Sequence, residues 1–557
     1  MKPHQVLSVI GLGFCFIFNA KGAIRYVNVN STNPVAPYLS WATAAKVIQD
    51  AVDAALTGDE VLVTNGIYRI GGRLIDNLTT NRVAVTNRLL LQSVKGPTVT
   101  AIVGYQVPNE TNGDSAIRCV YLGRGAVLSG FTIRNGATAT LFGTPDRSGG
   151  GITGFSSSSI SNCVITGNSA SEQGGGVYDV GIVINCVISN NCGGLGGAAA
   201  YCNLTDCTIV GNCATYSWGQ GGGVFGCGLS NCIVKVNQAD IVGGGAVSST
   251  LTNCMLVSNS AGFWGGGTYD CILYRCTLIG NSANGGGGAG GGTLNDCVLR
   301  GNVAASIGGA GSGDNVPGTL NNCTLVGNSA GSEAGGAYNL TLKNCIVYHN
   351  LAPSNPDYTG TNLNYCCTPI LPPAGIGNIT STPLFVNETQ GNLRLQSNSP
   401  CINAGFNGFV NSATDEDGNP RISGPAVDIG AYEFQLSNLS PFRLWLQSFG
   451  LATDGSADYT DPDRDGMNNW QEWICGTIPT NNFSVLRMVS AVALPSGVRI
   501  SWQSVSNRTY FVQRSTDVAS PFSFLMIGNN IPGQSGTTGY TNANASGGPF
   551  FYRVGVE

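Results

Sequence analysis

Residues 160–350 repeat one short unit nine times, and this repeat constrains the fold more than any other feature of the sequence. Each unit opens with an apolar residue, reaches a Cys three positions later, and ends with an Asn five positions after that Cys. The residue just before the Cys is usually Asn or Asp, and successive Cys residues are 21 to 26 positions apart. The nine ladder cysteines are Cys163, Cys186, Cys207, Cys232, Cys254, Cys276, Cys297, Cys323 and Cys345. The nine ladder asparagines are Asn168, Asn191, Asn212, Asn237, Asn259, Asn281, Asn302, Asn328 and Asn350.

A period of about 22 residues with short apolar runs and glycine turns is typical of a stacked solenoid. A helical repeat would need about ten residues of 3.6-residue periodicity in each unit, and none is present. The Cys and the apolar residue two positions later share one strand face, because side chains alternate along a strand. We therefore predict three short strands and three turns per unit, which together form one coil of a parallel β-helix. The turns fall before the Cys, at the repeated Asn, and at a Gly-rich segment.

Both ladders are predicted to be structural. A row of Asn residues can pass amide hydrogen bonds from coil to coil, and a row of Cys residues fills an interior stack with small apolar side chains. Parallel Cβ vectors fit the dihedral angle of a disulfide poorly. A second partial column contains Cys202, Cys227 and Cys271, and Cys192 and Cys213 occupy equivalent positions in neighbouring coils. Outside the main ladder, Cys192 and Cys213 are the candidates for a disulfide.

Composition excludes two broad classes of protein. The 557 residues are enough for two to four domains. Charged residues make up only 10% of the chain, hydrophobic residues make up 42%, and the net charge is −5. This balance argues against a disordered chain. Because no basic cluster is present, it also argues against nucleic-acid binding.

Residues 1–22 are predicted to be a secretory signal peptide. Lys2 and His4 precede a mostly apolar run from Val6 to Phe18, and the segment 20–22 has the small residues of a cleavage site. The apolar run is too short to span a membrane, and no second long apolar run follows, so we expect no transmembrane segment in the mature chain. We expect the protein to be secreted, either extracellular or on the cell surface, where some cysteines can pair.

Residues 23–148 are predicted to begin the solenoid. Apolar residues between Val47 and Ala55 fall on one helical face, and such a helix would cap the open end of the stack. The segment 58–66 is expected to form a turn, a strand and another turn. The segment 130–135, Gly-Phe-Thr-Ile-Arg-Asn, is expected to be an early coil with an aromatic residue near the Cys position.

The helix, the 58–63 strand, the 130–135 coil and the nine Cys/Asn units together resemble secreted right-handed parallel β-helix proteins of the pectate-lyase-like class. The resemblance covers about residues 24–435. The segment 397–433, with Pro400-Cys401 and Asp428-Ile-Gly430, resembles the choice-of-anchor Q segment that closes the β-helix in bacterial surface proteins. Those proteins usually continue into a sorting signal, which this sequence does not contain. Four acids of this segment could hold a cation, but packing and turn roles are favoured: Asp415, Asp417, Asp428 and Glu433.

The pectate-lyase-like class includes polysaccharide lyases, so the resemblance implies that the solenoid could carry catalytic groups. Elimination at a uronic acid needs a cation or basic group on the carboxylate and a base for the α-proton. The basic residues between positions 149 and 350 fall at different places in their coils: Lys235, Arg275, Arg300, Lys343 and His349. The acids are also spread, with Asp206 and Asp296 predicted simply to replace the turn Asn: Asp179, Asp206, Asp270 and Asp296. No catalytic residue is assigned.

Aromatic residues around the Gly-rich turn suggest carbohydrate binding. Tyr178, Phe225, Tyr269 and Tyr338 each follow a glycine turn by two residues, and Trp218 and Trp264 lie in or beside that turn. Exposed aromatic rings stack on the apolar faces of sugars. For the Tyr/Phe column, an inward-pointing core stack is the favoured alternative. For the two Trp residues, neither alternative is favoured.

Residues 436–480 are predicted to form a helical linker with a calcium loop. Oxygen ligands at positions 1, 3, 5, 9 and 12, with Gly at position 6, match the EF-hand-type spacing. The predicted ligands are Asp461, Asp463, Asp465, Met467 through its carbonyl, Asn469 and Glu472. The spacing resembles the single loops of dockerin-like and thrombospondin-type-3-like linkers. The alternative is an acidic turn that caps a helix. The predicted role of the Ca²⁺ is to stiffen a joint.

Residues 481–557 alternate apolar and polar side chains in short runs, which indicates a small β-sandwich. It weakly resembles fibronectin-III-like modules. The sequence thus predicts an all-β protein with a β-helix at 23–435, ladder coils at 149–350 and a closing segment at 391–435. The predicted function is non-catalytic binding of a polysaccharide or surface glycan, as in an adhesin. The alternative is a polysaccharide lyase that acts on an acidic polysaccharide.

Overall fold

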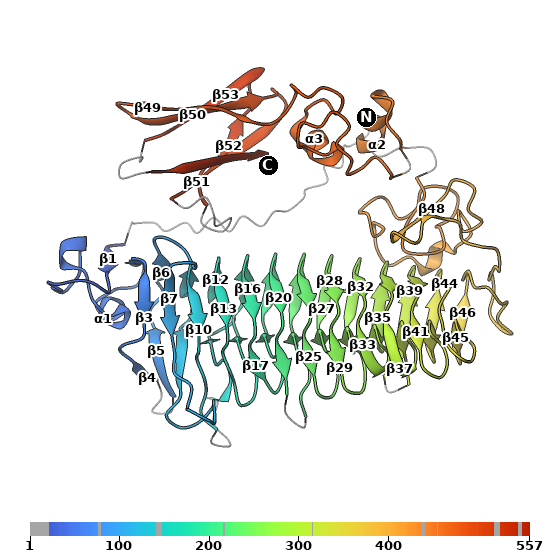
Figure 1. Ribbon diagram of the computed structural model, residues 1–557, viewed down its shortest axis with the longest axis horizontal. Helices are drawn as coiled ribbons and strands as arrows, with labels where there is room; N and C mark the ends of the chain where they lie inside the picture. The colour runs from blue at the N-terminus through green and yellow to red at the C-terminus, as the bar shows by residue number, and fades with distance from the viewer. Residues whose placement is uncertain are drawn as a thin grey trace.

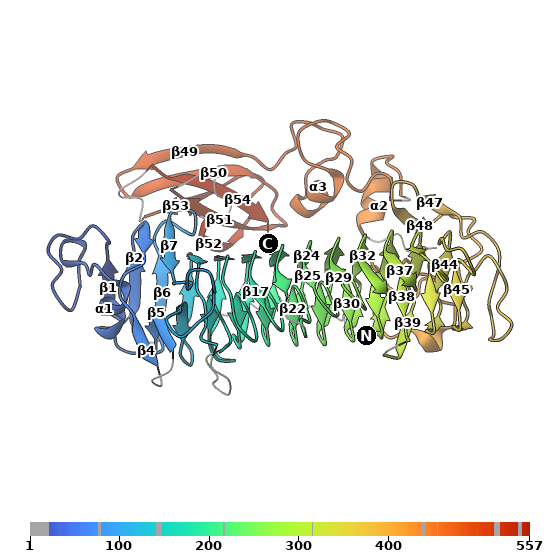
Figure 2. The same cartoon turned by 60° about the horizontal axis from the view of Figure 1, so that its bottom comes forward.

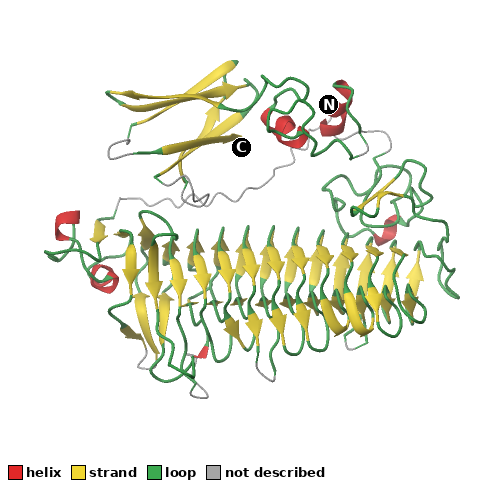
Figure 3. Ribbon diagram, in the orientation of Figure 1, coloured by secondary structure: helices red, strands yellow, loops and turns green. Residues whose placement is uncertain are grey.

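In the computed structural model, residues 24–364 wind into a parallel β-helix whose coils stack along one axis (Figure 1). The described residues are 22–75, 79–140, 147–215, 218–314, 316–435, 441–453, 455–516, 524–543 and 549–556. The predicted signal peptide, apart from Gly22, lies outside them. The right-handed parallel β-helix predicted from the repeat is confirmed, and Figure 3 shows how little of the chain is helical.

Three sheets run the length of the β-helix and a fourth spans seven of its coils, and successive coils contribute neighbouring strands in register. Sheet A contains β1 (Ile24–Val27), β2 (Glu60–Val63), β6 (Leu90–Ser93), β9 (Val127–Ser129), β12 (Ser159–Ser161), β15 (Ile182–Ile184), β19 (Asn203–Thr205), β23 (Gly228–Ser230), β27 (Thr250–Thr252), β31 (Ile272–Tyr274), β35 (Gly292–Asn295), β39 (Gly318–Asn321), β43 (Thr341–Lys343) and β46 (Asn362–Asn364). Sheet B contains β3 (Gly66–Tyr68), β7 (Thr100–Val103), β10 (Thr132–Arg134), β13 (Val164–Thr166), β16 (Val187–Ser189), β20 (Thr208–Val210), β24 (Ile233–Lys235), β28 (Met255–Val257), β32 (Thr277–Ile279), β36 (Val298–Arg300), β40 (Thr324–Val326) and β44 (Ile346–Tyr348).

Sheet C follows the Gly-rich turn of each coil. It contains β4 (Arg73–Ile75), β5 (Thr79–Val85), β8 (Ile117–Leu122), β11 (Ile152–Thr153), β14 (Val177–Tyr178), β18 (Ala199–Ala200), β22 (Val224–Phe225), β26 (Ala246–Val247), β30 (Thr268–Tyr269), β34 (Ala289–Gly290), β38 (Gly311–Ser312), β42 (Ala337–Tyr338) and β45 (Tyr358–Thr359). The strands pair in parallel except for β4 and β5, which are antiparallel.

Sheet D was not predicted, and it corrects the expectation of three strands per coil. It contains β17 (Cys192–Gly193), β21 (Cys213–Ala214), β25 (Gln238–Ala239), β29 (Ser260–Ala261), β33 (Ser282–Gly285), β37 (Val303–Ile307) and β41 (Ser329–Ala330). Most of these strands are only two residues long, which is too short for side-chain alternation to be recognised in the sequence.

Most of the predicted turns have the backbone conformation that their residue type favours, although Arg275 and Val236 also adopt a positive φ at these positions. The residue before the ladder Cys has a positive φ, for example 52° at Asn162 and 53° at Asp296. Asn and Asp tolerate this left-handed region better than most residues. The ladder Cys then enters sheet B, and the coil turns again just before the ladder Asn, where Gly280 has a φ of 63°.

The Gly-rich turn is explained by the close approach of adjacent coils. A Cβ on Gly244 would lie 2.3 Å from the Ser260 carbonyl oxygen, and one on Gly266 would lie 2.3 Å from the Ser282 carbonyl oxygen. No side chain fits at these distances, so the middle residue of each turn must be glycine.

Both ends of the β-helix core are covered. Helix α1 (Ile48–Asp53) buries Ile48, Ala51 and Val52 against β1, β2 and β5, as the predicted capping helix requires. A short 3₁₀ segment, Trp41–Thr43, precedes it. At the other end, the closing segment 391–435 folds back along the outside of the last coils. It includes a second 3₁₀ segment, Asn407–Phe409, and strand β48 (Asn392–Leu395), which pairs with β47 (Phe385–Asn387).

The linker and the C-terminal domain run back toward the N-terminal coils on the side of the β-helix where the closing segment lies (Figures 1 and 2). The linker contains α2 (Pro441–Ser448) and α3 (Asn469–Cys475). The C-terminal domain contains two three-stranded antiparallel sheets. Their strands are β49 (Met488–Leu494), β50 (Gly497–Ser504), β51 (Thr509–Ser515), β52 (Leu525–Pro532), β53 (Gly536–Asn542) and β54 (Phe551–Val556). Among the described residues, no helix is long and apolar enough to cross a membrane.

Candidate functional site

The Asn and Cys ladders are structural, as predicted. In the Asn ladder, Nδ2 of Asn237 donates to Oδ1 of Asn259 at 3.0 Å, and Nδ2 of Asn259 donates to Oδ1 of Asn281 at 2.9 Å. In the Cys ladder, the backbone N–H of Cys232 points at the Cys254 sulfur at 3.4 Å. Phe131 occupies the Cys position of the preceding coil, where its N–H lies 3.5 Å from the Cys163 sulfur. The side chains of both ladders are buried and accessible to no substrate.

The predicted pairing outside the ladder is also present. Cys192 and Cys213 form a disulfide between the neighbouring strands β17 and β21, with 4.6 Å between their Cα atoms. Cys202, Cys227 and Cys271 form a second buried column, with Ser249 filling the coil between Cys227 and Cys271. These three thiols are free.

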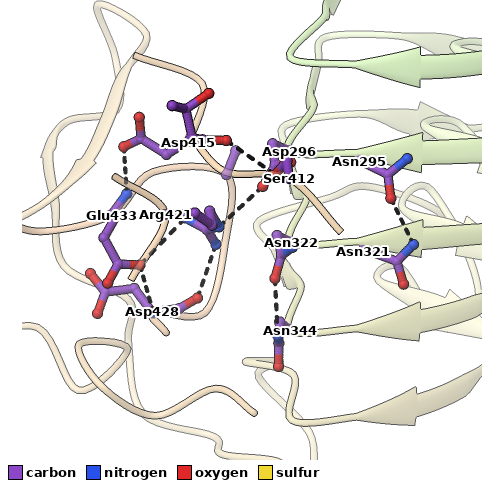
Figure 4. A network of polar contacts seen from close by, with 12 residues as sticks. Asn295, Asp296, Asn321, Asn322, Asn344, Ser412, Asp415, Arg421, Asp428 and Glu433 are labelled. Carbon is purple, nitrogen blue, oxygen red and sulfur yellow. Dashed lines mark hydrogen bonds and ion pairs between the residues drawn. The ribbon is translucent and has the colours of Figure 1, made fainter. Parts of the chain in front are cut away.

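The acids of the closing segment form a buried network around one arginine (Figure 4). Asp415 accepts hydrogen bonds from the backbone N–H of Asn419 at 2.8 Å and of Glu433 at 2.9 Å. Glu433 accepts from the N–H of Ser423 and of Asp428, at 2.8 and 2.9 Å. Burial raises the pKa of Asp415 to about 7 and of Glu433 to about 8. Because backbone donors already satisfy these oxygens, the favoured packing and turn role of the segment fits the structure.

This network contacts one column of solenoid residues. In each coil, the column residue is the one with positive φ directly before the ladder Cys. Arg275 donates to Thr414 Oγ1 at 3.0 Å, and Asn344 accepts from the Phe406 N–H at 2.8 Å. Asp296 pairs with Arg421 at 3.0 Å, and both side chains are fully buried. The prediction that Asp296 merely replaces the turn Asn is therefore wrong, because its charge anchors the closing segment.

A shallow groove runs along the outer face of sheet A, and we call it the sheet A groove. It consists of two adjoining hollows of about 500 and 390 Å³ that share Ser248 and Thr250. Its lining from β19 to β39 includes Asn203, Thr205, Ser230, Ser248, Thr250, Thr252, Asp270, Thr293 and Thr319. Among the described residues that line the groove, Asp270 is the only acidic or basic one.

The groove residues were not predicted, although the sequence contains a repeated pattern of polar residues that marks them. Four and two positions before each ladder Cys from Cys207 to Cys323, the residue is always uncharged, and most are Thr, Ser or Asn. Alternation places both positions on the solvent side of sheet A, because the apolar residue between them points inward. Leu251, between Thr250 and Thr252, is fully buried.

The Tyr/Phe column lies outside the core, so the favoured inward stack is wrong. Tyr178 and Tyr269 are half-buried, whereas their strand neighbours Val177 and Thr268 are fully buried. Because neighbouring residues of a strand point to opposite faces, the rings must face outward. The column lies on sheet C, one turn before the sheet A groove.

Tyr201 extends this aromatic row, although the spacing did not indicate it. Its ring centroid lies 6.0 Å from that of Tyr178 and 5.8 Å from that of Phe225, both in edge-to-face contact. Tyr201 is 45% exposed. Three aromatic rings from successive coils therefore form a partly exposed ridge.

The four predicted sugar-stacking residues do not share one position in the coil. Two of them, Trp218 and Trp264, lie before the Gly-rich turn. The other two, Tyr178 and Tyr269, lie after it. Trp218 is 39% exposed and packs over Gly194, while Trp264 is half-buried over Gly285. The loops that carry them stack through hydrogen bonds from Ile241 N to Gly219 O and from Phe263 N to Ile241 O. Phe263 is 53% exposed, so this edge of the coils also presents aromatic surface.

Apart from Arg275 and Asp296, which contact the closing segment, the ionisable residues of the ladder coils lie apart from one another within the described part of the chain. Lys235 and Arg300 extend from sheet B, Lys343 from sheet A, and His349 pairs with Glu388 at 2.9 Å. Asp179 and Asp270 occupy the same position in coils four apart, about 19 Å from each other. Paired carboxylates of glycoside hydrolysis lie within about 10 Å of each other.

The predicted calcium loop brings three carboxylates together. Asp461, Asp463 and Asp465 each place a carboxylate oxygen within 4.8 Å of the others. Gly466 has a φ of 96° and allows the chain to turn sharply at the sixth loop position. The Asp461 oxygens accept hydrogen bonds from the N–H groups of Arg464 and Gly466.

Several buried oxygens at this loop accept no hydrogen bond, and this fits a cation. They are Asp463 Oδ2, Asp465 Oδ2, Asn469 Oδ1, and both carboxylate oxygens of Glu472. Asn469 and Glu472 are fully buried. Burial, followed by the charges of Asp463 and Asp465, raises the pKa of Glu472 to about 8. Such a cluster is costly without a cation, since buried polar groups are normally paired.

The calcium loop also contacts the elements on both sides of it. Met467 accepts the Leu486 N–H at its sulfur at 3.4 Å, and Arg508 of the C-terminal domain donates to the Trp473 and Ile474 carbonyls. On the other side, α3 packs on α2, where the Trp473 and Phe442 ring centroids are 5.5 Å apart. The alternative of a helix-capping turn is also realised, because Asn468 and Gln471 form a capping box at α3.

Comparison with known proteins finds similarity in fold only. No protein-family model matches the sequence, and no curated protein sequence matches it. Among solved structures, pectate lyase Pel9A shares 16% identity over 74% of this chain and 97% of its own, with a TM-score of 0.34. The PL6-family alginate lyase AlyGC shares 11% identity over 63% of this chain and 55% of its own, with a TM-score of 0.33. The A-module of Azotobacter vinelandii mannuronan C-5 epimerase AlgE4 shares 12% identity over 59% and 89%, with a TM-score of 0.30.

Proposed function

We propose that this protein binds a polysaccharide or cell-surface glycan along the sheet A groove without cleaving it. The observation that carries the proposal is the groove lining, in which hydroxyl and amide groups line a surface open to an extended chain. From β19 to β39 the groove crosses six strands, a length of about 24 Å. Hydroxyl and amide side chains are the donors and acceptors that sugar hydroxyls need.

The aromatic ridge beside the groove supports the same proposal. Tyr178, Tyr201 and Tyr269 present ring surface on the neighbouring sheet, and sugar C–H faces pack well on such rings. The Trp218 and Trp264 loops offer a second stacking surface on the other side of the Gly-rich turn. We propose that the protein acts outside the cell or at its surface, where such glycans occur and where the Cys192–Cys213 disulfide is stable.

Binding is tested on a glycan array and by co-sedimentation with insoluble polysaccharides. Thr250→Trp together with Thr293→Trp would fill the groove and is expected to reduce retention at least tenfold. Thr341→Trp is the matched control, because Thr341 lies in the same outward column one coil beyond the groove. If the groove variant binds as well as the control, or if no glycan is retained, the proposal is overturned.

The alternative function is a polysaccharide lyase. It would need a base beside a cation-binding or basic group, and the groove offers only Asp270. Incubation with acidic polysaccharides, followed by ultraviolet absorbance of unsaturated product, separates the two functions. Sustained product formation that is lost in a groove variant would favour the lyase.

We further propose that the 461–472 loop binds Ca²⁺ as a structural ion. The support is the convergence of three carboxylates with a buried, unpaired Glu472. Asp461, Asp463, Asp465 and Glu472 would bind through carboxylates, Met467 through its carbonyl, and Asn469 directly or through water. The ion would neutralise the acids and fix the joint between the closing segment and the C-terminal domain. Calorimetric titration with Ca²⁺ tests this, and absence of binding would refute it.

A further inference from the structure

We infer that the ligand of the sheet A groove is a neutral glycan, not a polyuronate. The inference rests on the proposed function and specifies the class of sugar. It depends on which charges are present along the groove and which are absent.

The described residues that line the groove offer no cation. Its outward side chains are mainly hydroxyls, with the amide of Asn203 and the apolar Ile272 and Pro317, and its single charge is the carboxylate of Asp270. Arg275, the nearest basic residue in sequence, points to the closing segment, where its guanidinium donates to Thr414, and it also donates to Asn253 of the preceding coil. Lys343 lies beyond the groove on β43, with its ammonium 5.1 Å from the Phe409 ring centroid.

A polyuronate would carry one carboxylate per sugar into this surface. Each carboxylate would lose part of its hydration without gaining a charged partner, and a buried unpaired charge is strongly unfavourable. Asp270 would add like-charge repulsion in the middle of the groove. A neutral chain meets neither cost, because hydroxyl-to-hydroxyl hydrogen bonds replace its bonds to water.

One further acid lies just before the groove. Asp179 follows Tyr178 directly and occupies the same column as Asp270, one coil before the first strand of the groove. Burial raises the pKa of its carboxyl group, and the charge of Arg124 opposes this shift. Within the groove the only charge is therefore that of Asp270, and this distribution of charge favours neutral sugars.

The test compares neutral polysaccharides, such as mannan, xylan and galactan, with pectate and alginate by affinity electrophoresis. The wild-type protein should be retarded by at least one neutral polysaccharide and by neither polyuronate. Retardation should be unchanged within about twofold between 50 and 500 mM salt, because no ion pair is screened.

A variant with added positive charge tests whether the lack of cations is what prevents polyuronate binding. Thr250→Lys with Thr293→Lys places two cations in the groove and should create salt-sensitive retardation by pectate or alginate. Thr341→Lys adds one cation of the same kind outside the groove and should not create such retardation. Native folding of each variant is checked by its thermal unfolding.

The outcomes separate the two proposals. If a polyuronate retards the wild-type protein and Thr250→Trp/Thr293→Trp abolishes this, the groove binds glycan but the neutral-glycan inference is wrong. If no polysaccharide of either class is retarded, the binding function itself fails. If a neutral polysaccharide binds equally to all groove variants, the ligand lies elsewhere and both proposals fail.

Discussion

Arg421 and Asp296, 125 positions apart in the sequence, form an ion pair with 3.0 Å between Nε and Oδ1 and no exposure to solvent. Arg421 also donates to the carbonyls of Asp428 and Gly430. This side chain therefore links parts of the closing segment to each other and helps to fix the segment to the solenoid. The β-helix is not closed by its last coil alone.

Removing Arg421 should destabilise the protein strongly. Arg421→Met leaves Asp296 buried without its partner, and breaking such a pair costs about 3–5 kcal/mol. Adding Asp296→Asn removes the stranded charge and restores the commonest turn residue, so the double variant should recover part of the loss. Denaturant unfolding measures both. If the double variant loses as much stability as the two single variants together, the ion pair is not the source of the destabilisation.

The Asn ladder should be intolerant of truncation at its centre. Asn259→Ala removes the acceptor for the N–H and Nδ2 groups of Asn237 and the donor to the Val234 carbonyl. Each buried group left unpaired costs about 1–3 kcal/mol. Thr252→Ala, on the solvent side of the same coil, should change stability by no more than about 0.5 kcal/mol. Equal melting temperatures for the two variants would contradict the role assigned to the ladder.

Glycine in the middle of the Gly-rich turn should be irreplaceable for steric reasons. Gly266→Ala would bring a Cβ to 2.3 Å from the Ser282 carbonyl oxygen and force two coils apart. Gly301 has a positive φ of 62° but open space around its Cβ position, so Gly301→Ala should cost only the left-handed strain of about 1–2 kcal/mol. Thermal unfolding should rank Gly266→Ala as clearly less stable. The reverse ranking would show that coil spacing is not the constraint.

Stabilisation by calcium should increase with pH. The pKa of Glu472 is raised from 4.5 to about 8, so without calcium its contribution to stability is fully present below about pH 4.5 and is lost as the pH rises through about 8. Calcium binds the ionised form and removes this loss. At 100 times its dissociation constant, the ion stabilises the bound state by about 2.7 kcal/mol. The difference in melting temperature between calcium and EDTA should thus be larger at pH 8 than at pH 5.5.

Glu472→Gln is the control for this pH dependence. It imitates the protonated side chain, so the variant without calcium should be more stable at pH 8 than the wild type without calcium. It should also lose most of the calcium effect. A wild-type calcium effect that is constant across this pH range would exclude Glu472 as a ligand.

The coil architecture was predictable because its causes are local. A 22-residue period, a Cys and an apolar residue on one strand face, and Asn or Gly at each turn fix the path of each coil before it meets the next. The same locality allowed a calcium loop to be predicted around Asp461 and Glu472, since all its candidate ligands lie within 12 consecutive residues. The two-residue strands of sheet D were missed because they carry too few side chains for a pattern.

The direction of the aromatic column could not be decided from the sequence. Tyr178 and Val177 are both apolar neighbours on a two-residue strand, and only the stacking of coils shows that Val177 fills the core. The sheet A groove could not be predicted from the sequence for the same reason, because its width depends on how sheet A and the turn that precedes it are placed in the folded coil.

The sequence by itself determined that this chain must stack, since each repeat carries an apolar face that only the next repeat can cover. Only the tertiary structure decided where the chain after the last coil goes. The contacts of Phe406, Ser412, Arg421 and Gly430 with the last four coils join residues 62 to 125 or more positions apart. No local period encodes such contacts, because they depend on the shape and charge that the finished solenoid presents.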